Sequence, residues 1–261
     1  MGKQMVKKEE QSLVKLDLKK YAGRGSENAT STEDLAIPIV QLLQGQSQKV
    51  KDGKGDAGQF SNNVTNQIVD SFDAIPCAYW RDYIGWVPRS KGGGFGCRYT
   101  VEQIEGGEVK TKWIEYTGED GKLRRKLMDE QGHEVRDTRN HLVLMRVEGE
   151  GWMPALIPMA STQVKKSKRW NTRMKSIELP DGQGGVFNPP TFAYQYHITS
   201  EDESGGGNDW KGFDISMTGP VEDEALIQKA NSWFELFKKG ELQFADDKME
   251  GEGSSVEGEA F

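Results

Sequence analysis

Residues 74–88 read AIPCAYWRDYIGWVP, a run of β-branched and aromatic side chains that favours the extended backbone of a β-strand. Similar runs recur between glycine-rich or polar turns at residues 109–116, 141–147, 153–158, 191–199 and 210–218. Six short strands, with one helix among them and one after them, predict a single mainly β domain. A closed or half-open barrel fits this order better than an alternating β–α–β design.

Residues 161–175, STQVKKSKRWNTRMK, predict an amphipathic helix inside this β-rich region. At about 100° per residue, one face collects the apolar side chains, which are Val164, Trp170, Met174 and Ile177. The remaining surface collects the cations, which are Lys165, Lys166, Lys168, Arg169, Arg173 and Lys175. We expect Ser161 or Thr162 to cap the start of this helix by accepting hydrogen bonds from its first free N–H groups.

The cations of this helix have no acidic neighbours in the sequence, because no Asp or Glu occurs between Glu150 and Glu178. A solvated helix face usually mixes both signs of charge, whereas an all-positive face repels itself unless a polyanion or acids elsewhere in the fold compensate it. This bias favours a phosphate-contacting face. A merely solvated face stays open as the alternative.

Between residues 79 and 99, aromatic rings are interleaved with cations. The rings are Tyr79, Trp80, Tyr83, Trp86, Phe95 and Tyr99, and the cations are Arg81, Arg89, Lys91 and Arg98. Because a strand alternates its faces, a single core cannot bury all of these rings. Exposed rings beside cations suit single-stranded nucleic acid, since stacking contributes ~1 to 3 kcal/mol per base and cations hold the backbone. For any one ring, an ordinary aromatic β-core is the alternative.

Two further segments extend this pattern. Trp113 is flanked by Lys110 and Lys112, and residues 122–126 read KLRRK. A tryptophan between two lysines again offers a ring beside positive charge. The KLRRK run is consistent with the same interface, or with a solvated loop.

A second helix is expected after the last strand. Pro220 precedes three acids at residues 222–224, and Lys238-Lys239-Gly240 closes the segment. Between them runs an apolar stripe of Leu226, Ala230, Trp233, Phe234 and Phe237. Acids at the positive end of the helix dipole and lysines at the negative end stabilise such a helix.

The charge is distributed unevenly along the chain. The net charge is −7, and residues 241–261 hold seven acids against Lys248, or −6, which leaves about −1 for residues 1–240. The acidic balance therefore describes the tail and does not exclude a nucleic-acid-binding body. We expect a flexible N-terminal arm over residues 1–30, one domain over residues 31–240 and a disordered acidic tail over residues 241–261.

The composition also bears on compartment and redox state. No apolar run approaches the ~18 residues that a membrane span requires, and the N-terminus lacks the apolar region of a secretory signal. We therefore expect a cytoplasmic protein with no membrane partner. Cys77 and Cys97 lie outside any C-x-x-C pair, so two free thiols are favoured over a disulfide.

Motifs for catalysis or metal binding are not evident. The sequence has no P-loop, no H-E-x-x-H, no G-x-S-x-G and no zinc-deaminase pattern. His133, His141 and His197 make no compact pair with either cysteine, so neither a metal nor another cofactor is expected. The chain is interpreted as a binding protein and not as an enzyme.

Three stretches resemble phage-encoded single-stranded-DNA-binding proteins: residues 34–38 (DLAIP), 83–89 (YIGWVPR) and 161–171 (STQVKKSKRWN). An acidic tail ending in Phe261 is similar to the tails of such proteins in bacteria and tailed bacteriophages. The resemblance implies an OB-like fold and a tail tip, Glu257, Glu259 and Phe261, that contacts replication or recombination proteins. Bacterial tails usually end in an aspartate run and Pro-Phe, whereas this chain ends in Glu259-Ala260-Phe261, and this departure leaves the identity of the partner open.

The resemblance and the residues together predict sequence-tolerant binding of single-stranded DNA in phage DNA replication, recombination or repair, in the host cytoplasm. The expected DNA-contacting residues are Tyr79, Trp80, Arg81, Tyr83, Trp86, Arg89, Lys91, Phe95, Arg98, Trp113, Lys165, Lys166, Lys168, Arg169, Trp170, Arg173 and Lys175. A homo-oligomer stays open. The alternatives are a strand-annealing recombination protein and a metal-dependent nuclease or processing factor that uses distant acids.

Overall fold

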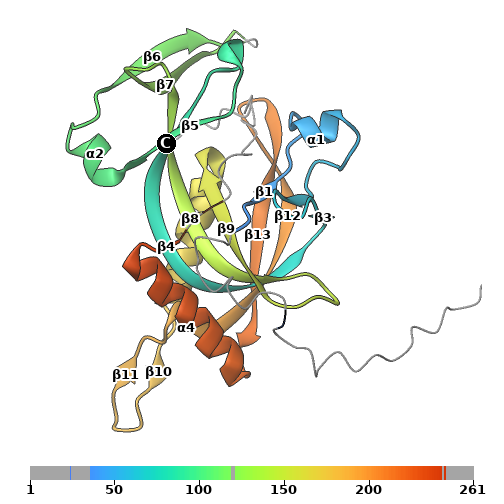
Figure 1. The fold of residues 1–261 in the computed structure, drawn as a ribbon, viewed down its shortest axis with the longest axis vertical. Helices are drawn as coiled ribbons and strands as arrows, with labels where there is room; N and C mark the ends of the chain where they lie inside the picture. The colour runs from blue at the N-terminus through green and yellow to red at the C-terminus, as the bar shows by residue number, and fades with distance from the viewer. Residues whose placement is uncertain (1–23, 25–35, 119–120, 243, 245–261) are drawn as a thin grey trace, which may run out of the picture.

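The computed structural model describes residue 24 and residues 36–118, 121–242 and 244. Nearly all of the expected N-terminal arm and most of the expected acidic tail, including Glu257, Glu259 and Phe261, lie outside these residues. The described chain is mainly β, with a curved antiparallel sheet and a helix after the last strand (Figure 1). The predicted fold class is therefore confirmed.

Two long strands form the spine of the large sheet. β4 (Phe72–Trp86) pairs with β8 (Glu134–Arg146) from Asp73 opposite Arg146 to Trp86 opposite Glu134. The sheet order is β13-β12-β4-β8-β7-β6, with β5 also on β4 and β9 also on β8. The remaining strands of the sheet are β5 (Phe95–Thr100), β6 (Thr111–Thr117), β7 (Leu123–Asp129), β9 (Met153–Ala160), β12 (Tyr194–Gly205) and β13 (Asn208–Pro220).

The spine has different neighbours along its length. At one end β12 lies on β4, and β9 lies on β8. At the other end β5 lies on β4, while β7 joins β8 through only two residue pairs and carries β6 on its outer edge. The strands β6 and β7 therefore form a two-stranded arm that extends one end of the sheet (Figure 1).

The barrel is half-open, because no continuous strand ladder closes the large sheet. Side-chain amides bond the edge strand β13 instead. A small sheet of β1 (Val40–Leu42), β2 (Phe60–Asn62) and β3 (Ile68–Val69) follows Ile39, which bridges Leu156 of β9. Gln44 then bonds the backbone of Lys211 twice, accepting from its N–H at 2.9 Å and donating to its C=O at 3.0 Å. Gln163 donates to the same carbonyl at 3.0 Å and accepts from the N–H of Phe213 at 3.1 Å. Two glutamines thus give partners to three backbone groups on the free edge of β13.

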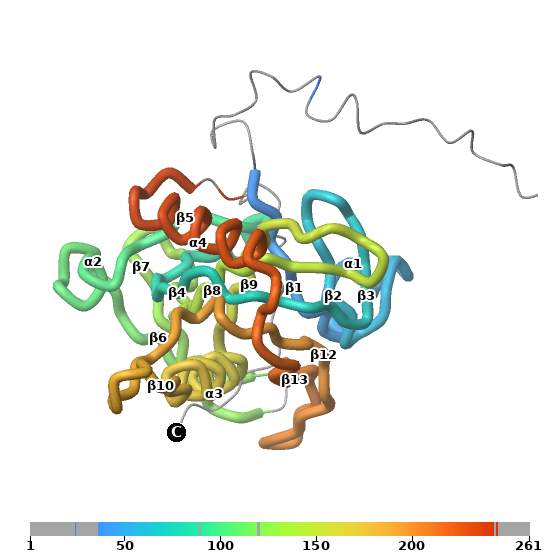
Figure 2. The backbone as a smooth tube through the Cα atoms, turned by 90° about the horizontal axis from the view of Figure 1, so that it is seen from below, coloured from blue at the N-terminus to red at the C-terminus, as the bar shows by residue number. Residues whose placement is uncertain are grey.

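Helices cover both faces of the spine. Figure 2 shows α3 (Val164–Lys175) on one side of β4 and β8 and α4 (Glu224–Lys239) on the other. The short elements are α1 (Gln48–Lys51), α2 (Val101–Glu105), η3 (Arg89–Lys91), η4 (Ser161–Gln163), η5 (Thr191–Ala193), β10 (Leu179–Pro180) and β11 (Val186–Phe187). No helix in the described part of the chain is long and apolar enough to span a membrane.

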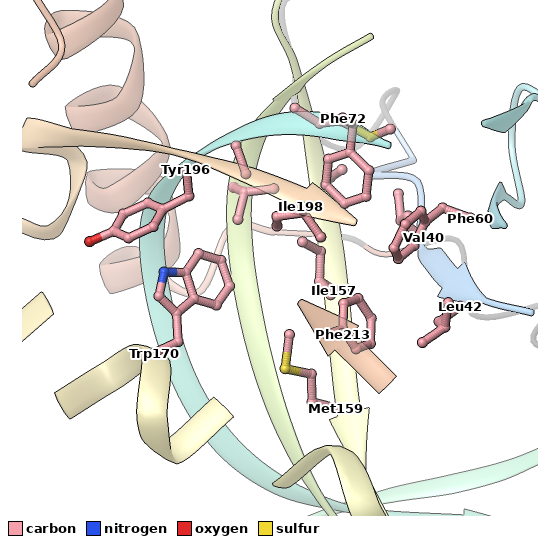
Figure 3. Close-up of a cluster of buried hydrophobic side chains, with 14 of the residues drawn as sticks. Val40, Leu42, Phe60, Phe72, Ile157, Met159, Trp170, Tyr196, Ile198 and Phe213 are labelled. Carbon is pink, nitrogen blue, oxygen red and sulfur yellow. The ribbon is translucent and has the colours of Figure 1, made fainter. Parts of the chain in front are cut away.

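Each of the two long helices buries its apolar face in a separate core. Beneath α3, Trp170 and Met174 join a buried cluster that Figure 3 shows between the strands, with the Trp170 ring beside Tyr196. Beneath α4, Ala230 is fully buried and Phe237 stacks on Trp80, with ring centroids 4.9 Å apart. The spine is therefore apolar on both faces where the helices cover it, which is why its two strands are almost continuously buried there.

The six predicted strands and both predicted helices are present, although their bounds differ. The KLRRK run lies largely in β7 and is not a loop, while β5 and the small sheet were not predicted. Ser161 and Thr162 do not cap α3, because they form the preceding turn η4, and Gln163 stands at the cap position with its side chain bonded to β13 and not to the first N–H groups of the helix. The ends of α4 lie at the expected acids and glycine, with Asp223 accepting from the Ala225 N–H and Gly240 adopting a φ of 73°. Cys77 and Cys97 are free thiols, as predicted.

The glutamine closure predicts a measurable stability effect. Gln44→Ala and Gln163→Ala should each lower the free energy of unfolding by about 1–3 kcal/mol, because each leaves backbone groups of β13 without a partner. The two changes should not be additive, since both amides bond the Lys211 carbonyl. Urea unfolding of the two single variants and the double variant measures this, with Gln183→Ala in an exposed loop as the control. Changes below about 0.5 kcal/mol in all variants would contradict the closure.

Candidate nucleic-acid interface

The strand register places several of the expected contact residues on the face of the sheet that α3 covers. On the spine, Tyr79 lies opposite His141, Arg81 opposite Arg139 and Tyr83 opposite Asp137. Directly opposite residues project from the same face of an antiparallel pair. The ring of His141 stacks on Trp170 of α3, with centroids 4.5 Å apart, so this face is the one that α3 covers.

Tyr79 is the outer end of a column of rings that runs from the surface into the core. Its side chain is 39% exposed, and its ring centroid lies 5.0 Å from that of His141. Beyond His141, Trp170 meets Tyr196 edge-on at 5.5 Å. The Nε2 atom of His141 lies 2.8 Å from Ser167 Oγ, which fixes the imidazole ring. Tyr79 therefore offers a base a ring on a rigid support, so little side-chain entropy remains to be lost on stacking.

The arm supplies a second exposed ring beside a cation. Trp113 of β6 is 60% exposed, and the Arg125 guanidinium lies 4.9 Å from its ring centroid. Trp113 pairs with Leu127, and Leu127 pairs with Val135 of the spine. This chain of direct pairs places Trp113 on the same face as Tyr79. Tyr116, beneath Lys126 at 5.1 Å, lies on the opposite face of the arm.

The basic helix presents a stripe of exposed cations. Residues spaced three or four apart share one helix face, and here that stripe consists of Lys165, Lys168, Arg169 and Lys175. None of the four makes an ion pair with another residue that the structure describes. Arg173 is also exposed and donates to the carbonyl of Ile215 at 2.8 Å, which ties the helix to β13. Lys165 acts electrostatically on Glu203, whereas Lys168, Arg169 and Lys175 have no acidic partner among the described residues, and such unpaired positive charge is what a phosphate backbone neutralises.

Lys166 differs from the other cations of the helix and corrects the expectation that all six face outward. Its side chain is 9% exposed and forms ion pairs with Glu201 and with Glu203, the latter at 2.9 Å. Burial acts to lower the pKa of Lys166, but the hydrogen bonds that its ammonium donates to the two carboxylates outweigh burial, so the pKa is raised. These acids of β12 compensate one charge of the helix. Lys166 therefore has a structural contact and is not open to phosphate.

Five of the expected rings are packed in the protein. Trp170 is 2% exposed and Tyr83 is 8% exposed. Trp80 donates through Nε1 to Asp82 at 3.1 Å on the α4 side, where Trp86 and Phe95 pack near Ile39. Because these rings pack against other side chains, the stacking surface does not include Trp80, Tyr83, Trp86, Phe95 and Trp170.

The expected arginines of the sheet are engaged with carboxylates. Arg81 pairs with Asp137 at 2.8 Å and Glu105 at 2.6 Å, and its hydrogen bond to Asp137 raises its pKa. Arg98 pairs with Asp82 at 3.4 Å. Lys91 is exposed, whereas the side chain of Arg89 lies outside what the structure describes. Arg81 and Arg98 therefore position the strands around the rings more than they offer free charge.

Some residues of this face were not predicted from the sequence. Arg125 was noted only within the basic run, and its contact with Trp113 depends on the hairpin register of β6 and β7. Cys97 Sγ lies 3.5 Å from His133 Nδ1 and 3.8 Å from Asp129 Oδ2. We expected no histidine near a cysteine, but Cys97 and His133 lie close together in the fold because β5 lies beside the β7–β8 turn. These three residues form a group that could hold a metal ion.

The chain belongs to a phage protein family. The family model described as Pam3 phage gp34-like protein matches residues 6–243, which is most of the sequence. No curated protein and no solved structure matches the chain. The comparisons therefore support a phage origin and leave the activity to be argued from the site.

The buried histidine beneath Tyr79 predicts a pH dependence. Burial lowers the pKa of His141 to about 3, whereas an exposed histidine titrates near about 6.5. Between these values the unfolded chain binds a proton that the folded protein does not, so stability present above pH ~6.5 is lost as the pH falls toward ~3. From pH 7.5 to pH 5 this amounts to about 2 kcal/mol.

Urea unfolding at the two pH values measures this loss. His141→Gln should lose about 2 kcal/mol less than the unmodified protein on acidification. The control is His197→Gln, at the surface beside Asp73, which should retain the loss. Equal losses in His141→Gln and the unmodified protein would contradict the role given to His141.

Proposed function

We propose that this member of the Pam3 phage gp34-like family binds single-stranded DNA without sequence preference during phage DNA replication, recombination or repair. The observation that carries the proposal is the shared face of Tyr79 and Trp113. Both are exposed rings, one on a rigid support and one beside Arg125, and α3 with its unpaired cations packs on the same side of the sheet. This combination of stacking platforms and positive charge suits a single strand.

In the proposed mechanism, bases stack on Trp113 and Tyr79 while phosphates contact the helix. Each stacked base contributes ~1 to 3 kcal/mol, and every base has a π-face, which explains tolerance of sequence. The cations involved are Lys165, Lys168, Arg169 and Lys175 on α3 and Arg125 on the arm. A duplex hides its base faces, so it should lose the stacking contribution and retain only the phosphate contacts.

The acids near the start of α3 make one end of this surface negatively charged. Glu201 and Glu203 pair with Lys166, and Asp202 pairs with Lys211 at 2.6 Å. These carboxylates repel phosphate at the β12–β13 hairpin. We therefore propose that the strand leaves the arm toward Lys168 and Lys175 and away from this hairpin.

The acidic C-terminal tail is the second part of the molecule with a proposed role. We propose that Glu257, Glu259 and Phe261 contact replication or recombination proteins, and that the protein acts in the cytoplasm of the infected host without catalysing a reaction. A flexible acidic segment can also compete with DNA for a basic surface. Deleting residues 246–261 should then leave DNA affinity unchanged or increase it.

The first test of the proposal is fluorescence anisotropy of labelled oligo-dT and of a duplex of equal length, titrated across salt with EDTA present. Tight binding of the single strand, with a steep salt dependence and much weaker duplex binding, is expected. Equal affinity for both, or no binding at low salt, would contradict it. Oligo-U in the same assay distinguishes RNA from DNA, and large rings or filaments would favour strand annealing.

Ring variants test the stacking surface in the same assay. Trp113→Ala and Tyr79→Ala should each weaken oligo-dT binding by about 5- to 150-fold, the equivalent of ~1 to 3 kcal/mol. Tyr116→Ala is the matched control, because Tyr116 lies on the other face of the same strand. A loss in Tyr116→Ala equal to that in Trp113→Ala would place the site elsewhere.

Charge variants test the helix. Replacing Lys165, Lys168 and Arg169 by Ala should reduce the slope of log K against log salt by about 2, given ~0.7 per contact on a single strand. The matched control removes three cations of α4, which are Lys229, Lys238 and Lys239, from the far side of the sheet. An unchanged slope in the α3 variant would remove the helix from the interface.

A further inference from the structure

Three side chains with different metal-ligating atoms meet at the base of the arm. Cys97 lies on β5, Asp129 is the last residue of β7, and His133 lies in the turn before β8. The Sγ atom of Cys97 is 3.5 Å from His133 Nδ1 and 3.8 Å from Asp129 Oδ2, and His133 Nδ1 is 2.8 Å from Asp129 Oδ2. The three ligand atoms thus define a small triangle.

We propose that Cys97, Asp129 and His133 bind a zinc ion. Tetrahedral zinc, with Zn–S of about 2.3 Å and Zn–N or Zn–O of about 2.0–2.2 Å, separates its ligand atoms by roughly 3.3–3.6 Å. Of the two distances from the sulfur, the 3.5 Å to His133 Nδ1 lies in this range and the 3.8 Å to Asp129 Oδ2 exceeds it by about 0.2 Å. The shorter Asp129–His133 contact is a hydrogen bond, which a metal would replace as the two atoms separate by about 0.5 Å. Water fills the fourth position.

The surroundings of the triangle have the features of a built site. The side chain of Asp129 is fully buried, and it accepts from the His133 N–H at 2.7 Å and from the Tyr99 hydroxyl at 2.8 Å. Such partners of a ligating carboxylate hold it in place for a metal. Glycine occurs where the ligands need room, since a Cβ at Gly85 would lie 2.4 Å from Cys97 Sγ and one at Gly96 would lie 3.0 Å from His133 Nε2.

A nucleophilic Cys–His–Asp triad fits the contacts less well than a metal. In a triad the nucleophile and the carboxylate contact opposite nitrogens of the imidazole. Here the sulfur and the carboxylate both approach Nδ1. The three donor atoms lie within 4.8 Å of one another, close enough for one cation to contact all of them.

The position indicates what the zinc would do. The arm joins the spine through only two residue pairs, Leu127–Val135 and Met128–Glu134. A metal held by β5, the end of β7 and the following turn would strengthen the link between the arm and β5, which pairs with β4 and already bonds Asp129 through Tyr99. It would then fix the direction of the arm and of Trp113. This consequence for DNA rests on the proposed function, but zinc binding itself does not.

Metal binding to the full chain tests the site. The protein is stripped of metal with EDTA, dialysed and titrated with Zn²⁺. The amount of zinc bound per protein chain is then measured by elemental mass spectrometry. We expect one equivalent of zinc and a rise of several degrees in the thermal midpoint. Cys97→Ser and His133→Ala should each weaken zinc binding by ~100-fold or more, and Cys77→Ala should bind zinc normally because Cys77 lies outside the site.

Cobalt substitution provides a readout that needs no variant to fold. Co²⁺ bound to the unmodified protein should show an intense thiolate-to-metal charge-transfer band and the strong visible absorption of tetrahedral cobalt. No tight equivalent of zinc, a cobalt spectrum without the thiolate band, or equal affinity in Cys97→Ser would overturn the proposal. Because neither assay contains DNA, failure here is distinguishable from failure of the anisotropy test.

Discussion

The antiparallel pairing of β4 with β8 is the constraint on which the other features depend, because it determines which side chains share a face. A bulge between Pro76 and Ala78 shifts the alternation of β4 by one residue. Before it, Ile75 faces the α4 core with Leu144, and after it the odd-numbered Tyr79 faces α3 with His141. If regular pairing continued through Cys77, Tyr79 would lie opposite Asn140 and project toward the α4 side. The bulge therefore sets the exposed ring and the packed Trp80 on their respective faces.

The strands and the two long helices follow from local patterns, and so they could be predicted from the sequence. Runs of β-branched and aromatic residues predict β4 and the second half of β8, and the spacing of Trp170 and Met174 predicts α3. Exposure of the rings could not be predicted, because it depends on the bulge and on α4 covering Trp80. A proline inside a predicted strand was a usable signal, since proline in sheets is largely confined to edges and bulges.

Contacts between distant segments explain the other differences. Lys166 lies outside the apolar arc of the helix, yet Glu201 and Glu203, from a strand that follows, draw it into the protein. Cys97 and His133 are 36 residues apart and meet only because β5 lies on β4 next to the β7–β8 turn. Neither the Lys166–glutamate contacts nor the Cys97–His133 contact could be predicted from local sequence patterns. The charge bias of α3 and the aromatic content of β4 are evident in the sequence. Their arrangement in space depends on the register of the strands.

The central claim is that one DNA strand contacts both the arm and the spine on the α3 side of the sheet. Photo-crosslinking tests it most directly, with an oligo-dT in which 5-iodouracil replaces single thymines and with crosslinked peptides identified by mass spectrometry. The account predicts crosslinks to the peptides that contain Trp113 and Tyr79, formed from positions a few nucleotides apart. Crosslinks confined to α4 or to the β10–β11 hairpin, with none at either ring, would contradict it.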